Sequence, residues 1–158
     1  LEDIRKAKEY LNLAKEQLKE RKQQFDEQIR IGIMIEIPAI ALIADLAAEE
    51  VDFASIGSND LTQYLSAADR MNPEVAAYYK SDSTAMLRLL GFVFREFSKR
   101  EKEISVCGEM AGNPETAQLL VGLGARKLSM SSGNIAGVKA KLAECTLQEL
   151  TTLAEKKL

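Results

Sequence analysis

The sequence contains no histidine, and only two of its 158 residues are cysteines, Cys107 and Cys145. A cysteine nucleophile is commonly activated by a neighbouring imidazole, so the missing histidine excludes a self-contained cysteine–histidine hydrolase. Metal clusters built from cysteine and histidine are excluded as well, because the two thiols lie far apart in the sequence. Cys107 lies in the stretch SVCGEMAGN (residues 105–113). Two roles remain for its thiol, that of a proton donor and that of a small core residue.

The chain also lacks an excess of positive charge and long apolar runs. Its formal net charge is −3 and its pI is near 5.2, so we expect no binding to nucleic acid or anionic lipid. No run approaches the roughly 18 apolar residues of a membrane span, and the opening LEDIRKAKEY lacks the apolar centre of a signal peptide. Together with the two apparently unpaired cysteines, these features predict a cytoplasmic location without membrane insertion.

The length, hydrophobic content and predicted elements of the chain fit one α/β domain. A length of 158 residues with 46% hydrophobic content is typical of a single soluble domain with its own core. We expect a leading helix (1–30), four βα units (31–145) and a C-terminal helix (146–158). Because the sequence starts at Leu1 rather than Met, we also expect it to be part of a longer chain.

The leading segment carries an apolar stripe at helical spacing, formed by Ile4, Ala7, Leu11, Ala14, Leu18 and Phe25. The charged residues between them predict a solvated opposite face. A coiled coil is an alternative, but Arg21 and Gln28 interrupt the second row of its heptad. We therefore favour a helix that packs on a sheet.

Four short apolar segments, residues 31–36, 52–57, 103–108 and 127–131, each precede a helical pattern. Pro38 and Pro114 are placed at the first turns of two of these helices, and Asn113 is a predicted cap. Residues 83–102 predict a further long helix. Strands that alternate with helices predict a parallel sheet, and the nearly continuous apolar character of the strands predicts that both sheet faces are covered.

Four βα units are half of a TIM (β/α)8 barrel, for which about 250 residues is typical. We therefore predict the C-terminal half of such a barrel. An open doubly wound sheet is the main alternative, but no G-x-G-x-x-G motif follows a strand, so dinucleotide binding has no support.

Polar side chains follow the predicted strands at their carboxyl ends, where sites form in both kinds of sheet. These are Glu36, then Asn59 and Asp60, then Cys107. Each has a structural alternative: Glu36 as a carboxylate at a helix N-terminus, Asn59 and Asp60 as helix caps. Arg70 would ordinarily form a surface ion pair with its neighbour, and Cys107 would ordinarily be a buried small residue, as we expect for Cys145.

Taken together, these residues predict a site. Two carboxylates, Glu36 and Asp60, suit Mg²⁺, which keeps waters and takes further ligands from a substrate phosphate. The Asn59 amide and the Arg70 guanidinium can bind phosphate or carboxylate oxygens. A thiol has a pKa near 8.5, so Cys107 can carry a proton without any histidine.

Four segments, MIEIPA (34–39), DFASIGSNDLTQYLSAADRMN (52–72), VCGEMAGNPE (106–115) and KLSMSSGNI (127–135), carry a family resemblance. They resemble, in order, the C-terminal phosphoenolpyruvate-binding barrel of Enzyme I, the phosphoenolpyruvate-protein phosphotransferase of the bacterial sugar phosphotransferase system. Pyruvate phosphate dikinase and phosphoenolpyruvate synthase share the Glu-x-Pro and SNDLTQ-like segments. The AADRMN and CGEMAG segments look more like Enzyme I.

The resemblance implies that Glu36 and Asp60 coordinate Mg²⁺, with Mn²⁺ as a substitute, and that Asn59 and Arg70 hold the substrate's phosphate. Cys107 would protonate the methylene carbon as pyruvate forms. The phosphoryl group would pass to a histidine on a separate domain and then to a phosphocarrier protein. The family's usual dimer forms through this barrel.

Two departures from the family pattern are visible. Ser81, Ser83 and Thr84 stand where the family usually has a Pro-x-His-Pro-like sequence. The family's earlier arginines and its phosphorylated histidine would lie before Leu1, so we expect the isolated chain to be inactive. A fragment of a dikinase or synthase is one alternative, and a non-catalytic oligomerisation module is another. Because a half-barrel exposes strand edges, we expect the isolated chain to self-associate or to be partly disordered.

Overall fold

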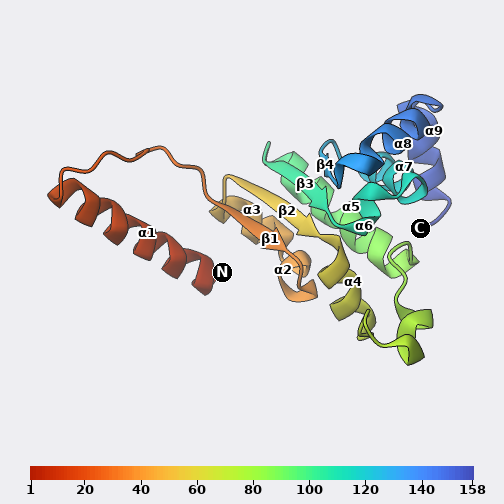
Figure 1. Cartoon of the computed structure of the whole chain (residues 1–158), viewed down its shortest axis with the longest axis horizontal. Coiled ribbons are helices and arrows are strands. Elements are labelled where there is room, and N and C mark those ends of the chain that lie inside the picture. The colour runs from red at the N-terminus through yellow and green to blue at the C-terminus, as the bar shows by residue number, and fades with distance from the viewer.

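The computed structural model describes residues 1–158 and contains a four-stranded, fully parallel sheet in the order β1-β2-β3-β4 (Figure 1). The strands are β1 (Gly32–Ile35), β2 (Phe53–Gly57), β3 (Glu103–Cys107) and β4 (Leu128–Ser129). Each lies within a segment that the sequence predicts to be a strand. The predicted mixed α/β fold with a parallel sheet is therefore confirmed.

Helices connect the strands and follow the last one. They are α2 (Pro38–Leu42), α3 (Ala44–Glu50), α4 (Ser58–Ser66), the 3-10 helix η1 (Pro73–Tyr78), α5 (Thr84–Lys99), α6 (Glu109–Gly112), α7 (Pro114–Leu123), α8 (Ser132–Ala143) and α9 (Leu147–Glu155). Asn113 caps α7 as predicted, since its side chain accepts hydrogen bonds from the N–H groups of Glu115 and Thr116. The single helix predicted after Pro38 is wrong: Ile43, with φ −114° and ψ 32°, separates α2 from α3.

The leading helix differs from its prediction in length and in packing. Helix α1 (Glu2–Glu20) ends well before residue 30, because Lys22 adopts a left-handed φ of 53° and the Gln23 N–H bonds back to the Leu18 carbonyl at 2.9 Å. No residue of α1 is buried, and the helix lies outside the layer of helices on the sheet (Figure 1). Near its N-terminus, Arg5 and Lys8 pair with Glu50 of α3, and nearer its C-terminus Lys15 and Lys19 contact Glu27 of the segment that follows the helix.

The hydrophobic core lies on one face of the sheet. Ile35, Ile56, Val106 and Leu128 form one row across all four strands and belong to or pack against the core. On the opposite face, Met34 is 45% exposed, and none of the side chains there belongs to the core cluster. The prediction that both faces are covered is therefore wrong for this chain. The prediction failed because it took every apolar strand residue to be buried, whereas the apolar residues Phe53 and Met34 lie on the open face.

The strand order explains why the helices share a face. Each strand pairs with the next one in the sequence, without the reversal of direction that defines a doubly wound sheet. Parallel crossovers are almost always right-handed, so a sequential order places all connecting helices on the same side. This arrangement is the one found in (β/α) barrels, and it agrees with a partial barrel rather than with the doubly wound alternative.

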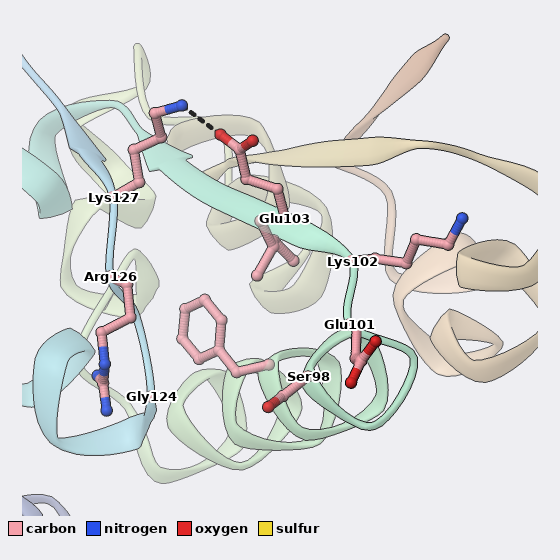
Figure 2. A pocket seen from close by; sticks show the side chains of 9 residues that line it. Ser98, Glu101, Lys102, Glu103, Gly124, Arg126 and Lys127 are labelled. Carbon is pink, nitrogen blue, oxygen red and sulfur yellow. Dashed lines mark hydrogen bonds and ion pairs between the residues drawn. The ribbon is translucent and has the colours of Figure 1, made fainter. Parts of the chain in front are cut away.

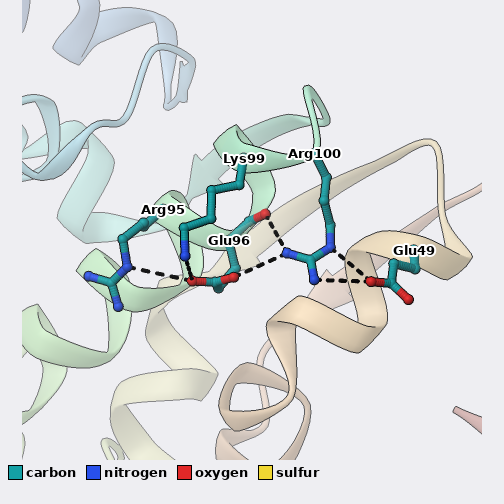
Figure 3. Close-up of polar contacts among 5 residues, drawn as sticks. All are labelled: Glu49, Arg95, Glu96, Lys99 and Arg100. Carbon is teal, nitrogen blue, oxygen red and sulfur yellow. Dashed lines mark hydrogen bonds and ion pairs between the residues drawn. The ribbon is translucent and has the colours of Figure 1, made fainter.

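An ion-pair network joins two of the covering helices (Figure 3). The buried Glu96 carboxylate lies 2.8 Å from Lys99 Nζ and 3.1 Å from Arg100 Nη1, with Arg95 also close. These cations, Lys99 most of all and then Arg100, hold the pKa of Glu96 below its usual range. Arg100 also reaches Glu49 at 3.0 Å, which links α5 to α3. No helix in the structure has the length and apolarity needed to cross a membrane.

Candidate active site at the carboxyl ends of the strands

Four of the five predicted site residues line a single hollow of about 220 Å³ at the carboxyl ends of β1, β2 and β3. They are Glu36, Asn59, Asp60 and Cys107, and Met34, Gly57, Ser58 and Gly108 complete the lining. These residues come from three separate βα units. The structure therefore brings together side chains that the sequence places up to about 70 residues apart.

Asn59 and Asp60 lie in the first turn of α4, directly after β2. Neither serves as a cap, because the N-cap position is Gly57 and no side chain bonds to the free N–H groups there. Asn59 instead uses Oδ1 to accept a hydrogen bond from the backbone N–H of Glu109 at 3.0 Å. The Asn59 amide nitrogen, which makes no hydrogen bond within the protein, is the group that can donate to a ligand.

The turn after β3 depends on a glycine. Gly108 has φ 102° and ψ −173°, a conformation that is essentially restricted to glycine. A Cβ atom at this position would also lie 2.5 Å from Ser58 Oγ and 2.9 Å from Asn59 Oδ1. Ser58 Oγ donates to the Cys107 carbonyl at 2.7 Å. The absence of a side chain at Gly108 thus allows the loops after β2 and β3 to come into contact.

Cys107 is half-buried at the end of β3, on the open face of the sheet. Its Sγ lies 3.4 Å from the Ile56 carbonyl, a weak hydrogen bond in which the thiol donates. The side chain lines the hollow that holds Glu36 and Asp60, and also a neighbouring hollow of about 390 Å³ next to β4 and α8. Cys107 is therefore not a fully buried core residue, which was its structural alternative. Cys145, by contrast, lines neither hollow and accepts a hydrogen bond from Gln118 Nε2 at 3.3 Å.

Arg70 is the fifth predicted residue. Its guanidinium Nη1 lies 3.6 Å from Asp60 Oδ1, and both side chains are about 40% exposed. The neighbouring Asp69 makes no ion pair with Arg70, since its carboxylate accepts a hydrogen bond from the Met71 N–H. An exposed pair of this kind contributes little to stability. Its effect is to place a cation beside the carboxylate that lines the hollow.

Glu36 follows β1 and lines the same hollow as Asp60 and Gly57. A Cβ atom on Gly57 would lie 3.0 Å from Glu36 Oε2, so the carboxylate lies against the glycine backbone. No cluster of three histidine, cysteine, aspartate or glutamate side chains with metal-binding geometry occurs in the structure. Two carboxylates that share one hollow suit Mg²⁺, which typically uses one or two protein carboxylates together with water and phosphate oxygens.

Tyr79 is a residue of this region that the sequence analysis did not identify. Its hydroxyl donates to the Asn59 carbonyl at 3.1 Å, although 20 residues separate the two. Burial, with a further effect of the Glu109 charge and some opposition from Arg70, raises the pKa of Tyr79. No spacing pattern in the sequence marks this tyrosine, because it lies in an irregular segment.

A larger hollow, of about 450 Å³, lies at the other end of the sheet (Figure 2). Glu103, at the start of β3, pairs there with Lys127, which lowers the pKa of Glu103. Because Glu103 and Cys107 are at opposite ends of the same strand, this hollow is separate from the predicted site.

Comparison with known proteins defines the family. Residues 1–147 match the family described as PEP-utilising enzyme, PEP-binding domain. The chain is 44% identical over 153 residues to Multiphosphoryl transfer protein 2 of Escherichia coli (strain K12), covering 97% of this chain and 18% of that protein. It is 41% identical over 154 residues to the phosphoenolpyruvate-protein phosphotransferase of Bacillus subtilis (strain 168), covering 98% of this chain and 27% of that protein. The phosphoenolpyruvate-protein phosphotransferase of Staphylococcus aureus is also 41% identical, over 156 residues that cover 99% of this chain and 27% of that protein.

A parallel α/β sheet with polar side chains gathered at the carboxyl ends of its strands is consistent with part of an α/β barrel domain. The chain belongs to the PEP-binding domain family of PEP-utilising enzymes. The resemblance to phosphoenolpyruvate-protein phosphotransferase is confirmed, and with it membership of a family of transferases. The chain spans less than a third of the length of these relatives.

Proposed function

We propose that this chain is the C-terminal half of the phosphoenolpyruvate-binding barrel of a phosphoenolpyruvate-protein phosphotransferase. The observation that carries the proposal is the shared hollow: Glu36, Asn59, Asp60 and Cys107 line it, and Arg70 contacts Asp60. Relatives named for this activity align over nearly the whole chain. Preceding strands of the same protein would close the barrel, and they would cover the sheet face that bears Met34 and Phe53.

Glu36 and Asp60 would hold Mg²⁺ or Mn²⁺ at this site. The bound cation would neutralise phosphate charge during phosphoryl transfer. The fit rests on the placement of the two carboxylates in one hollow beside the first turn of α4.

The substrate phosphate would be bound by Asn59 and Arg70. The bond from Glu109 N–H to Oδ1 holds the Asn59 amide in place, and the amide nitrogen makes no hydrogen bond within the protein and can donate. The Arg70 guanidinium offers several donors in a fork that suits phosphate oxygens. Arg70 already pairs with Asp60 at 3.6 Å. A bound phosphate would therefore either replace the Asp60 carboxylate as the partner of the guanidinium or share the guanidinium with it.

Cys107 would supply the proton that converts the enolate to pyruvate. When the phosphorus–oxygen bond breaks, the phosphoryl group leaves to a histidine on another domain and the electron pair stays on the enolate oxygen. The carbonyl then forms as the methylene carbon takes the thiol proton, and solvent reprotonates the thiolate. The half-buried position of Cys107, lining two adjoining hollows, supports this role.

The rest of the protein would supply the phosphoryl acceptor. The histidine would lie on a separate domain that docks over the carboxyl ends of the strands and then passes the phosphoryl group to a phosphocarrier protein. The whole protein would act in the cytoplasm as a homo-oligomer. The isolated chain would be inactive without the preceding arginines.

The test is a Mn²⁺ titration of the full-length protein with and without phosphoenolpyruvate. We expect Mn²⁺ to tighten the binding of phosphoenolpyruvate, and phosphoenolpyruvate to tighten the binding of Mn²⁺. We also expect the phosphoryl group of phosphoenolpyruvate to be transferred to a histidine of the protein in the absence of nucleotide. A requirement for nucleotide would favour the dikinase or synthase alternative. If no metal-dependent binding of phosphoenolpyruvate were found, the protein would be better interpreted as a non-catalytic oligomerisation module.

The altered segment at 81–84 has a structural explanation. Ser83 caps α5 by accepting a hydrogen bond from Met86 N–H at 3.3 Å, and Thr84 Oγ1 donates to the Lys157 carbonyl at 3.0 Å. These residues start a helix and anchor the C-terminus, and none of them lines the hollow. Their departure from the family pattern therefore does not favour the non-catalytic alternative.

A further inference from the structure

Residues 71–80, which lie between Arg70 and α5, have one polar attachment to the site. Residues 71–80 include η1, and most of them are exposed. The only hydrogen bond between these residues and anything outside 69–83 is the one from Tyr79 Oη to the Asn59 carbonyl, at 3.1 Å. Tyr79 is half-buried, whereas the adjacent Tyr78 is 70% exposed and makes no side-chain hydrogen bond.

Asn59 is held at two points as a result. Its backbone carbonyl accepts from Tyr79, and its side-chain oxygen accepts from the Glu109 N–H at 3.0 Å. The first bond fixes the start of α4 against the returning segment, and the second fixes the direction of the amide. Because Asp60 is the next residue of the same helical turn, these two bonds also hold the backbone that carries its carboxylate.

The chemical state of Tyr79 suits this contact. A tyrosine keeps its proton at neutral pH, and burial, followed by the Glu109 charge, raises the pKa of Tyr79 further. A protonated hydroxyl can donate to a carbonyl oxygen, whereas a phenolate cannot.

We propose that Tyr79 is a positioning residue for the substrate and metal site: its hydroxyl holds the first turn of α4 so that Asn59 and Asp60 face the hollow. This inference rests on the proposed function for the identity of the ligand. It adds that the segment 71–80 acts on binding through one hydroxyl group.

The test compares Tyr79→Phe with Tyr78→Phe in the full-length protein. Each substitution removes one hydroxyl and keeps the ring. We expect Tyr79→Phe to raise the KM for phosphoenolpyruvate about 3- to 10-fold, the range for loss of one hydrogen bond, with kcat within about twofold of wild type. Tyr78→Phe should change neither value. A purely structural role would lower the melting temperature without this split between KM and kcat.

Amide hydrogen exchange gives a readout that does not depend on turnover. Exchange across α4 (Ser58–Ser66) should be faster in Tyr79→Phe than in Tyr78→Phe, with similar global stability. If the two variants match in both KM and exchange, the inference is wrong while the proposed function stands. If wild-type protein does not turn over phosphoenolpyruvate, the proposed function fails, and equal exchange in the two variants would then overturn the positioning role as well.

Discussion

Asn59 Oδ1 accepts a hydrogen bond from the backbone N–H of Glu109 at 3.0 Å, and this bond joins the first turn of α4, after β2, to the start of α6, after β3. The first of these segments carries Asn59 and Asp60, two of the proposed binding residues, and the second follows Cys107. The bond therefore links the two segments directly. The lack of a side chain at Gly108 allows them to approach each other.

Gly108→Ala should destabilise the protein and impair the site. The conformation at Gly108 is strained for any other residue by about 1–3 kcal/mol, and the new Cβ would meet Ser58 Oγ and Asn59 Oδ1. Urea unfolding should show the loss of stability. Gly137→Ala is the matched control, because nothing lies within 4 Å of a Cβ atom there and alanine favours the interior of α8 by about 1 kcal/mol. Equal effects of the two substitutions would contradict this account of the turn.

Glu36→Gln and Asp60→Asn should each weaken binding of Mn²⁺ or Mg²⁺ about 10-fold or more, since each removes a proposed ligand charge and changes little in shape. Calorimetric titration of the full-length protein with Mn²⁺ measures this directly. Glu74→Gln is the control: Glu74 is an exposed carboxylate in η1 that makes no ion pair. Metal affinity that stays at the wild-type value in both site variants would rule out the proposed metal site.

Cys107→Ser should lower kcat for pyruvate formation about 10²- to 10⁴-fold, the usual contribution of a general acid, because a serine hydroxyl is a far weaker proton donor. The KM for phosphoenolpyruvate should change little, since the thiol has no part in holding the phosphate. Cys145→Ser is the control, because Cys145 lines neither of the two hollows. Pyruvate release coupled to lactate dehydrogenase measures the rate, and full activity of Cys107→Ser would remove the thiol from the mechanism.

The network around Glu96 predicts how stability depends on pH. Lys99 and Arg100 hold the pKa of Glu96 below its ordinary value of 4.5 in the folded protein. A group with a lowered folded-state pKa contributes stability above its unfolded pKa and loses it as pH falls through the folded pKa. The urea midpoint should therefore drop as pH is lowered from about 5, and Glu96→Gln should lower the midpoint at pH 7 but flatten this acid dependence.

Glu101→Gln serves as the control for this measurement, because Glu101 is exposed and makes no ion pair. It should leave both the midpoint at pH 7 and the acid dependence as in wild type. An unchanged pH profile in Glu96→Gln would show that other carboxylates, such as Glu103 and Glu50, account for the acid sensitivity instead.

Much of the fold was predictable because its signals are local. Asn113 and Pro114 mark the start of α7, and the structure has the helix begin there with the predicted cap. The end of α1 was not predictable from its apolar stripe, since Phe25 continues the spacing while the left-handed turn at Lys22 stops the helix. Helical spacing shows which residues could share a face, but it does not show where the backbone turns away.

The predicted site residues lie together because their strands are parallel neighbours. Glu36, Asp60 and Cys107 each follow a strand, so a parallel sheet must bring them to one edge. Their roles in catalysis stay proposals. Tyr79 was missed because a tyrosine in an irregular segment gives no periodic or motif signal, and its partner carbonyl on Asn59 is a backbone group that every residue possesses.

The sequence by itself determined the strand segments, most of the helices, the family and the residues that the strand ends present, because these depend on side chains at short spacing. Only the tertiary structure decided that one face of the sheet is left open and that Asn59 is held by both Tyr79 and Glu109. The physical reason is that these contacts join residues 20 and 50 positions apart through backbone atoms, whose positions follow from how the units pack rather than from the identity of any one residue.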